Sequence, residues 1–136
     1  TYVDITGITA SITPAATSSK ILILSSLSFT NDYAGSALNH MYLMLLRGTT
    51  EIVKGDAASS RTRATHVISS QFGDEMKATP FVYLDSPSTT SATTYKMQAK
   101  SGNANDFFLN RSVNDTDDAA KSGRVASTFT LMEIGA

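Results

Sequence analysis

Hydrophobic and polar residues alternate with a period of two along much of the chain. The longest such run is residues 124–134 (RVASTFTLMEI), in which successive side chains would face opposite sides. This spacing is typical of a β-strand with one face in the protein core. Residues 3–12 show the same alternation. Residues 20–30 begin with a continuous apolar run, which predicts a strand buried on both faces in its first half.

Further segments of this kind follow at roughly ten-residue spacing, separated by turns rich in Gly, Asn, Asp and Ser. The predicted strands are residues 3–12, 20–30, 38–47, 49–53, 64–72, 78–84, 93–100, 107–113 and 124–134. The segments before and after residues 73–75 are expected to pair as a hairpin. Eight to ten short strands without a convincing helix predict an all-β, antiparallel β-sandwich, jelly-roll-like in architecture. A chain of 136 residues fits one such domain, residues 1–136.

The segment 38–47 (LNHMYLMLLR) is ambiguous, because its apolar residues also fit one stripe of a helix. Ten residues are few for a helix, however, and Arg47 and Gly48 lead directly into the short apolar segment 49–53. A strand, a turn containing Gly and a second strand form a hairpin. We therefore interpret the segment as a strand.

Composition narrows the function. Ser and Thr together make up 36 of the 136 residues, whereas charged residues are only 17%, with a net charge of −1. A partner with a phosphate backbone or an anionic membrane would require a basic patch, so neither is expected. The chain has no Cys and must be stabilised by its core or by association with other chains. It begins at Thr1, and we expect that it is a fragment of a longer polypeptide or lacks a short N-terminus.

Catalytic chemistry has little support in the sequence. The two histidines, His40 and His66, have no second histidine at metal-ligand spacing. The sequence has no nucleophile-elbow motif and no glycine-rich nucleotide-binding motif. Adjacent acidic pairs such as Asp117 and Asp118 have no reason to face each other across a substrate, as glycoside hydrolysis would require. We therefore predict a non-enzymatic protein without a cofactor.

Two loops carry candidate binding chemistry. Residues 114–118 (NDTDD) concentrate oxygen ligands suited to calcium, but acidic surface loops are common and this one lacks the EF-hand pattern. In residues 55–63, Arg61 and Arg63 flank a threonine and could bind a carboxylate or an acidic sugar. An ion pair with Asp56 or with a neighbouring subunit is the simpler interpretation.

Several segments together resemble small domains at the C-terminal end of bacteriophage tail-fibre-like and head-appendage proteins. They are residues 4–14 (DITGITASITP), 17–23 (TSSKILI), 46–52 (LRGTTEI), 55–65 (GDAASSRTRAT), 83–87 (YLDSP), 91–95 (SATTY) and 127–134 (STFTLMEI). The resemblance covers nearly the whole chain. The chain departs from the pattern of these domains at residues 31–41 and 101–118. Variable loops on a constant scaffold are where binding specificity usually lies.

The resemblance implies a virion structural protein that is assembled in the bacterial cytoplasm, forms a homotrimer and contacts other phage structural proteins. In one reading it is an adhesin for host-surface polysaccharide; in the other it is a decoration, or cement, protein of the capsid. We place residues 124–134 near the threefold axis as a hypothesis. The candidate contact residues are Tyr33, Arg61, Arg63, Asn103, Asn105, Asp115 and Asp117.

Overall fold

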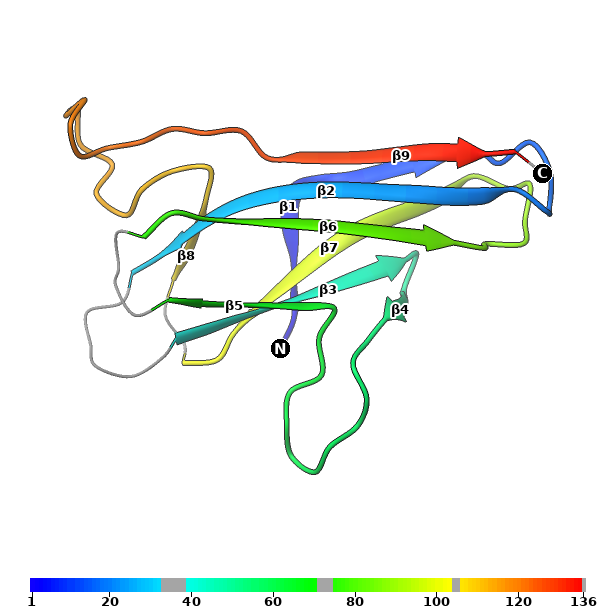
Figure 1. Cartoon of the computed structure of the whole chain (residues 1–136), viewed down its shortest axis with the longest axis horizontal. Helices are drawn as coiled ribbons and strands as arrows, with labels where there is room; N and C mark the ends of the chain where they lie inside the picture. The colour runs from blue at the N-terminus through cyan, green and yellow to red at the C-terminus, as the bar shows by residue number, and fades with distance from the viewer. Residues whose placement is uncertain (33–38, 71–74, 104–105, 136) are drawn as a thin grey trace.

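The computed structural model describes residues 1–32, 39–70, 75–103 and 106–135, and these form strands, turns and loops without a helix (Figure 1). The strands are β1 (Val3–Ile12), β2 (Lys20–Asn31), β3 (Asn39–Arg47), β4 (Thr50–Val53), β5 (His66–Ser70), β6 (Lys77–Asp85), β7 (Thr93–Ser101), β8 (Phe107–Leu109) and β9 (Thr128–Ile134). The predicted all-β fold is confirmed. The segment with the ambiguous pattern is a strand.

Two antiparallel sheets pack against each other as a β-sandwich. The first has the order β1-β7-β3-β4, with β5 also paired to β3, and the second has the order β6-β2-β8, with β9 also paired to β2. β3 and β4 form the predicted hairpin. The predicted pairing of β5 with β6 is wrong, because β5 pairs with β3 and β6 pairs with β2 in the other sheet. Two strands that are consecutive in the sequence therefore belong to opposite layers.

The core lies between the sheets and consists of the inward-facing residues of β2, β3 and β7. Its fully buried members are mainly Ile21, Ile23, Leu27, Met41, Leu43, Leu45, Tyr95 and Met97. The alternation predicted for the C-terminal strand is confirmed within β9, because Phe129 and Leu131 pack against the core whereas Met132 and Ile134 are exposed. Residues 124–127, predicted as part of the same strand, precede it, and Val125 is 43% exposed. The period of two thus assigns each face of β9 correctly.

The strand that is buried on both faces is β3 and not β2. Met44 and Leu46 point away from the core yet are almost completely buried. The segment between β4 and β5 contributes to this cover, since the Thr65 hydroxyl lies 3.7 Å from the Met44 sulfur. In β2 the corresponding residues, Leu22 and Leu24, are only half-buried, so the prediction for the first half of that strand is wrong.

A two-residue turn, Gly48-Thr49, joins β3 to β4. Gly48 has φ of +60°, in the left-handed region, whereas Thr49 is not among the residues with positive φ. Glycine at the first central position of such a turn matches the right-handed twist of the two strands. The sequence Arg-Gly-Thr-Thr therefore fixes the register of the hairpin.

Candidate functional site

One end of the sandwich carries the longest connection, residues 110–127 between β8 and β9, and also residues 102–103 after β7 (Figure 1). The opposite end carries the connections 13–19, 48–49 and 86–92. The first of these ends contains Asn103, Asp115 and Asp117 of the predicted contact residues. Tyr33 and Asn105 lie outside the described residues.

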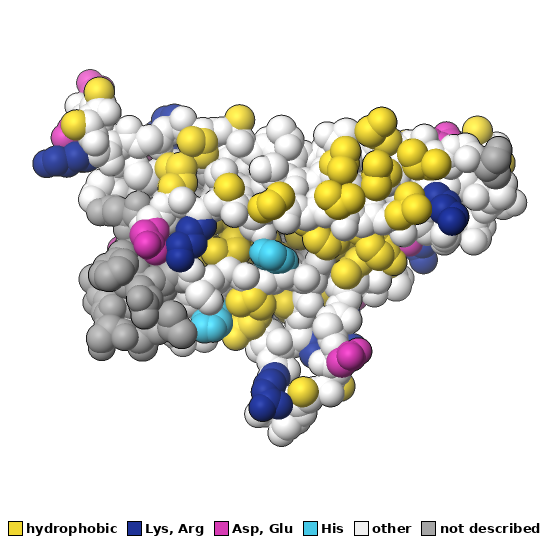
Figure 2. Space-filling view, viewed as in Figure 1, with side chains coloured by type: hydrophobic (Ala, Val, Ile, Leu, Met, Phe, Trp, Pro, Cys, Tyr) yellow, Lys and Arg dark blue, Asp and Glu magenta, His cyan; other side chains and the backbone are white. Residues whose placement is uncertain are grey.

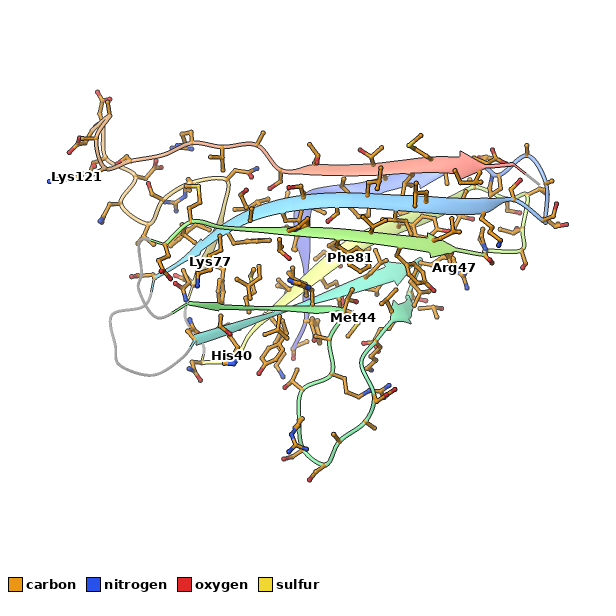
Figure 3. All side chains as sticks on the ribbon, viewed as in Figure 1. His40, Met44, Arg47, Lys77, Phe81 and Lys121 are labelled. Atoms are coloured by element: carbon orange, nitrogen blue, oxygen red, sulfur yellow. The ribbon has the colours of Figure 1, made fainter. Side chains whose placement is uncertain are left out.

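The connection between β8 and β9 is held together by its own side chains. Asp115 accepts two hydrogen bonds from Arg124, at 2.5 and 2.6 Å, and Asp118 accepts one from the backbone of Ala120 at 2.9 Å. Asp117 is exposed, and Lys121 lies at the tip of the loop (Figure 3). The loop therefore presents charged and hydroxyl groups to solvent on a framework of internal bonds.

This arrangement gives calcium no support. The carboxylate of Asp115 is occupied by the guanidinium of Arg124, which competes with a cation for the same oxygens. Across the residues that the structure describes, no three His, Asp or Glu side chains are grouped so that they could hold a metal ion.

The two loop arginines lie on a different part of the surface. Arg61 and Arg63 belong to the loop between β4 and β5, which projects away from the end that carries the other contact residues (Figure 1). Arg63 donates to the backbone carbonyl of Gly55 at 2.6 Å, and within the described chain neither arginine forms the expected ion pair with Asp56. The structure thus divides the predicted contact residues between two surfaces.

The two histidines do not combine into a site. His66 pairs with the core residue Leu43, whereas His40 lies three residues before Leu43 in the same strand and therefore points to the opposite side of the sheet. The ring of His40 contacts that of Tyr42, with a centroid distance of 5.9 Å. Both histidines are half-buried sheet residues.

The most specific cluster of polar side chains is buried and was not predicted from the sequence. One carboxylate oxygen of Asp85 accepts hydrogen bonds from Arg47 Nη1 at 2.8 Å and from the Tyr95 hydroxyl at 2.7 Å. Arg47 lies at the end of β3 beside the end of β6, as Figure 3 shows. Asp85 thereby joins the second sheet to β3 and β7 of the first.

The electrostatics of this cluster favour a structural role. Burial, together with the neighbouring Asp85 carboxylate, raises the pKa of Tyr95 far above its usual value of 10.0. A general acid or base needs a pKa near the working pH, and the shift is in the opposite direction. Tyr95 is also fully buried, so substrate has no access to its hydroxyl. The carboxylate of Asp85 is a cross-link between the sheets.

The outer face of the second sheet carries an apolar surface over part of its area, and the remaining outward-facing positions of β2 and β9 include Ser26, Ser28, Thr128 and Thr130. We define the β6–β2–β9 face by its apolar residues, Leu22, Leu24, Val82, Leu84, Met132 and Ile134. Leu22 lies between Leu84 and Met132 in the sheet, and Leu24 lies next to Val82, so the apolar side chains are contiguous. Val82 is 64% exposed and Met132 48% exposed. Figure 2 shows hydrophobic side chains gathered over these three strands.

Charge is almost absent from this face. Among the outward-facing residues of β2, β6 and β9, only Lys20 is charged, and it lies at the margin opposite Ile134. The outer face of the first sheet is different, because Asp4 accepts hydrogen bonds there from Lys96 at 2.9 Å and Gln98 at 2.8 Å. An antiparallel sheet with one face in water usually carries polar and charged residues on that face. The two outer faces therefore differ in polarity.

These features define a β-sandwich domain with its longest loop at one end and an apolar surface on the outer face of one sheet. No family model matches the chain, and no curated protein matches it either. Within the described residues there is no helix long and apolar enough to cross a membrane.

Proposed function

We propose that this chain is a non-enzymatic structural domain of a bacteriophage virion, a jelly-roll-like sandwich that forms a homotrimer and contacts the host surface. The observation that carries this proposal is the loop end of the sandwich, where the longest connection, residues 110–127, presents exposed polar and charged side chains at the same end as Asn103. Loops placed together at one end of a rigid sandwich are a common arrangement for recognition. The segments that resemble phage virion domains supply the viral context.

The chemistry of the loop end suits a polysaccharide. Asn103 and Asp117 are exposed there, and amide and carboxylate groups bind the hydroxyl groups of sugars through hydrogen bonds. The internal bonds of Asp115 and Asp118 hold the loop in shape before it meets a ligand. Such preorganisation lowers the entropy cost of binding. The loop end is therefore our candidate for the receptor contact.

The alternative function is decoration of the capsid, which the resemblance to head-appendage domains also allows. In that case the exposed loop end, rather than the β6–β2–β9 face, would meet a capsid subunit. The two functions differ in where the chain lies on the particle. Imaging of intact virions with a specific antibody fragment distinguishes them, since an adhesin lies at a fibre tip and a cement protein follows the capsid lattice.

Binding of the fluorescently labelled protein to an array of bacterial surface polysaccharides tests the adhesin. We expect Asp117→Ala and Asn103→Ala to lower the binding at least ~10-fold, as loss of direct hydrogen bonds would do. Arg61→Ala, on the separate loop, is the matched control and keeps its binding. If the array is bound by none of these proteins, or equally by all of them, the loop end is not the receptor contact.

A further inference from the structure

We infer that the β6–β2–β9 face is the surface through which copies of this chain associate, with the face of each copy turned toward the symmetry axis. This inference rests on the homotrimer of the proposed function and adds which surface forms it. It goes beyond the hypothesis about residues 124–134, since it involves three strands and names the outward-facing residues of each. The six apolar residues that define the face are its centre.

The β6–β2–β9 face exposes apolar side chains that are contiguous. Leu22, Leu84 and Met132 form one row across the sheet, and Leu24 and Val82 form part of the next. Scattered exposed apolar residues are ordinary, but a contiguous patch of this kind marks an interaction surface. Sheet faces pack well against other sheet faces, as they do inside this sandwich. A third layer of sheet would bury the patch in the same way.

The near absence of charge on this face suits a symmetric assembly of identical chains. In a cyclic oligomer the same residue of every copy lies near the axis, so a charge placed there would face its own copies and repel them. The face avoids this problem, because Lys20 at its margin is the one charged residue among the outward-facing positions of its three strands. Interfaces between identical subunits are more apolar than the interfaces of proteins that associate transiently. A second copy of this chain is therefore the occupant that the face fits best.

The edge of the same sheet is poorly suited to pairing with another strand. β6 is an edge strand, and Pro80 stands near its middle with no N–H to offer a neighbouring strand. Proline at this position disfavours growth of the sheet by edge-to-edge pairing. Association through the face leaves that edge unused. The edge and the face thus point to the same mode of assembly.

Sedimentation of the full chain between about 1 and 100 µM measures the assembly, since its mass depends on concentration. Val82→Glu tests the face, and Val67→Glu is the matched control, because Val67 points outward from the first sheet opposite Tyr42 and is 42% exposed. Glutamates gathered around an axis repel one another, so we expect Val82→Glu to weaken association at least ~100-fold. Val67→Glu, on β5 of the other sheet, keeps the mass of the wild-type protein.

The outcomes separate the two proposals. If the wild-type protein is trimeric and Val82→Glu remains trimeric, the inference about the face is wrong while the homotrimer stands. If the wild-type protein stays monomeric at the highest concentration, both the homotrimer and this face as a self-association surface are wrong. Met132→Lys repeats the test on β9, and far-UV circular dichroism verifies the fold of every variant. Polysaccharide binding is read independently through the Asp117→Ala variant.

Discussion

Removal of a single hydroxyl group tests the link between the two sheets. In Tyr95→Phe the aromatic ring remains in the core, but the 2.7 Å hydrogen bond to Asp85 is lost. Asp85 keeps its bond to Arg47 at 2.8 Å, so the buried carboxylate is not left without a partner. The substitution therefore isolates one hydrogen bond between a neutral donor and a charged acceptor.

A hydrogen bond to a charged group contributes about 1.5–3 kcal/mol to stability. The cavity left by one oxygen atom is small, and phenylalanine has the shape of the tyrosine ring. We therefore expect the free energy of unfolding to fall by about 2 kcal/mol in Tyr95→Phe. Replacement of Asp85 by Ala should cost more, about 3–5 kcal/mol, because it removes the ion pair of Arg47 and leaves the buried Tyr95 hydroxyl without its acceptor.

Urea unfolding followed by circular dichroism measures these differences. Protein concentration must be fixed, since the stability of an oligomer depends on it. Tyr83→Phe is the matched control, because Tyr83 stacks on Phe81 and its hydroxyl forms no hydrogen bond within the described chain. The cross-link is refuted as a stabilising contact if Tyr95→Phe loses less than ~0.5 kcal/mol, or no more than the control.

The same pair predicts the response to alkaline pH. The pKa of Tyr95 is raised in the folded protein, so above pH 10 the unfolded chain releases a proton that the folded protein retains. Stability is therefore complete below pH 10 and decreases above it, by up to about 1.4 kcal/mol per pH unit. Tyr95→Phe should make this decrease shallower. An equal slope in both proteins contradicts the buried environment of the hydroxyl.

Three further predictions concern other parts of the fold. Hydrogen bonds from the Ser19 side chain and the Ala15 backbone lower the pKa of Glu133, so its contribution is present above pH 4.5 and is lost as the pH falls; Glu133→Gln should unfold with a shallower dependence on acid pH in thermal melts. Gly48→Ala should cost about 1–2 kcal/mol in urea unfolding, because alanine is strained at φ of +60°. Leu43→Ala should cost about 2–5 kcal/mol in the same assay, and a smaller loss would show that this core residue is not closely packed.

The local pattern of hydrophobic and polar residues was sufficient to predict the strands but not to predict which strands pair with each other. The period of two identified β9, and the short segment followed by the turn at Gly48 resolved the ambiguity of β3, because each signal depends only on residues close in sequence. The hairpin of β5 and β6 was expected from a short connection, yet each strand pairs with a distant one. A short loop can join two strands of one sheet or cross between two layers, and its length alone does not distinguish these cases.

The buried cluster was missed for a related reason. Arg47, Asp85 and Tyr95 come from three strands and are brought together only by the packing of both sheets. In the sequence, Asp85 follows an alternating segment and stands at the start of a polar loop. A charged residue at the inward position of a strand end needs a buried partner, and that is the signal that the sequence offers. The partner itself is set by tertiary structure.

The first half of β2 is less covered in the single chain than its sequence pattern predicts. This half, residues 21–24, has the continuous apolar pattern of a strand covered on both sides. In the chain alone, Ile21 and Ile23 are buried by the opposite sheet, whereas the outward-facing Leu22 and Leu24 are only half-buried. In β3 the same pattern is satisfied within one chain, because the segment before β5 covers its outer side. For β2, the cover that the pattern calls for would be supplied by another copy meeting the β6–β2–β9 face.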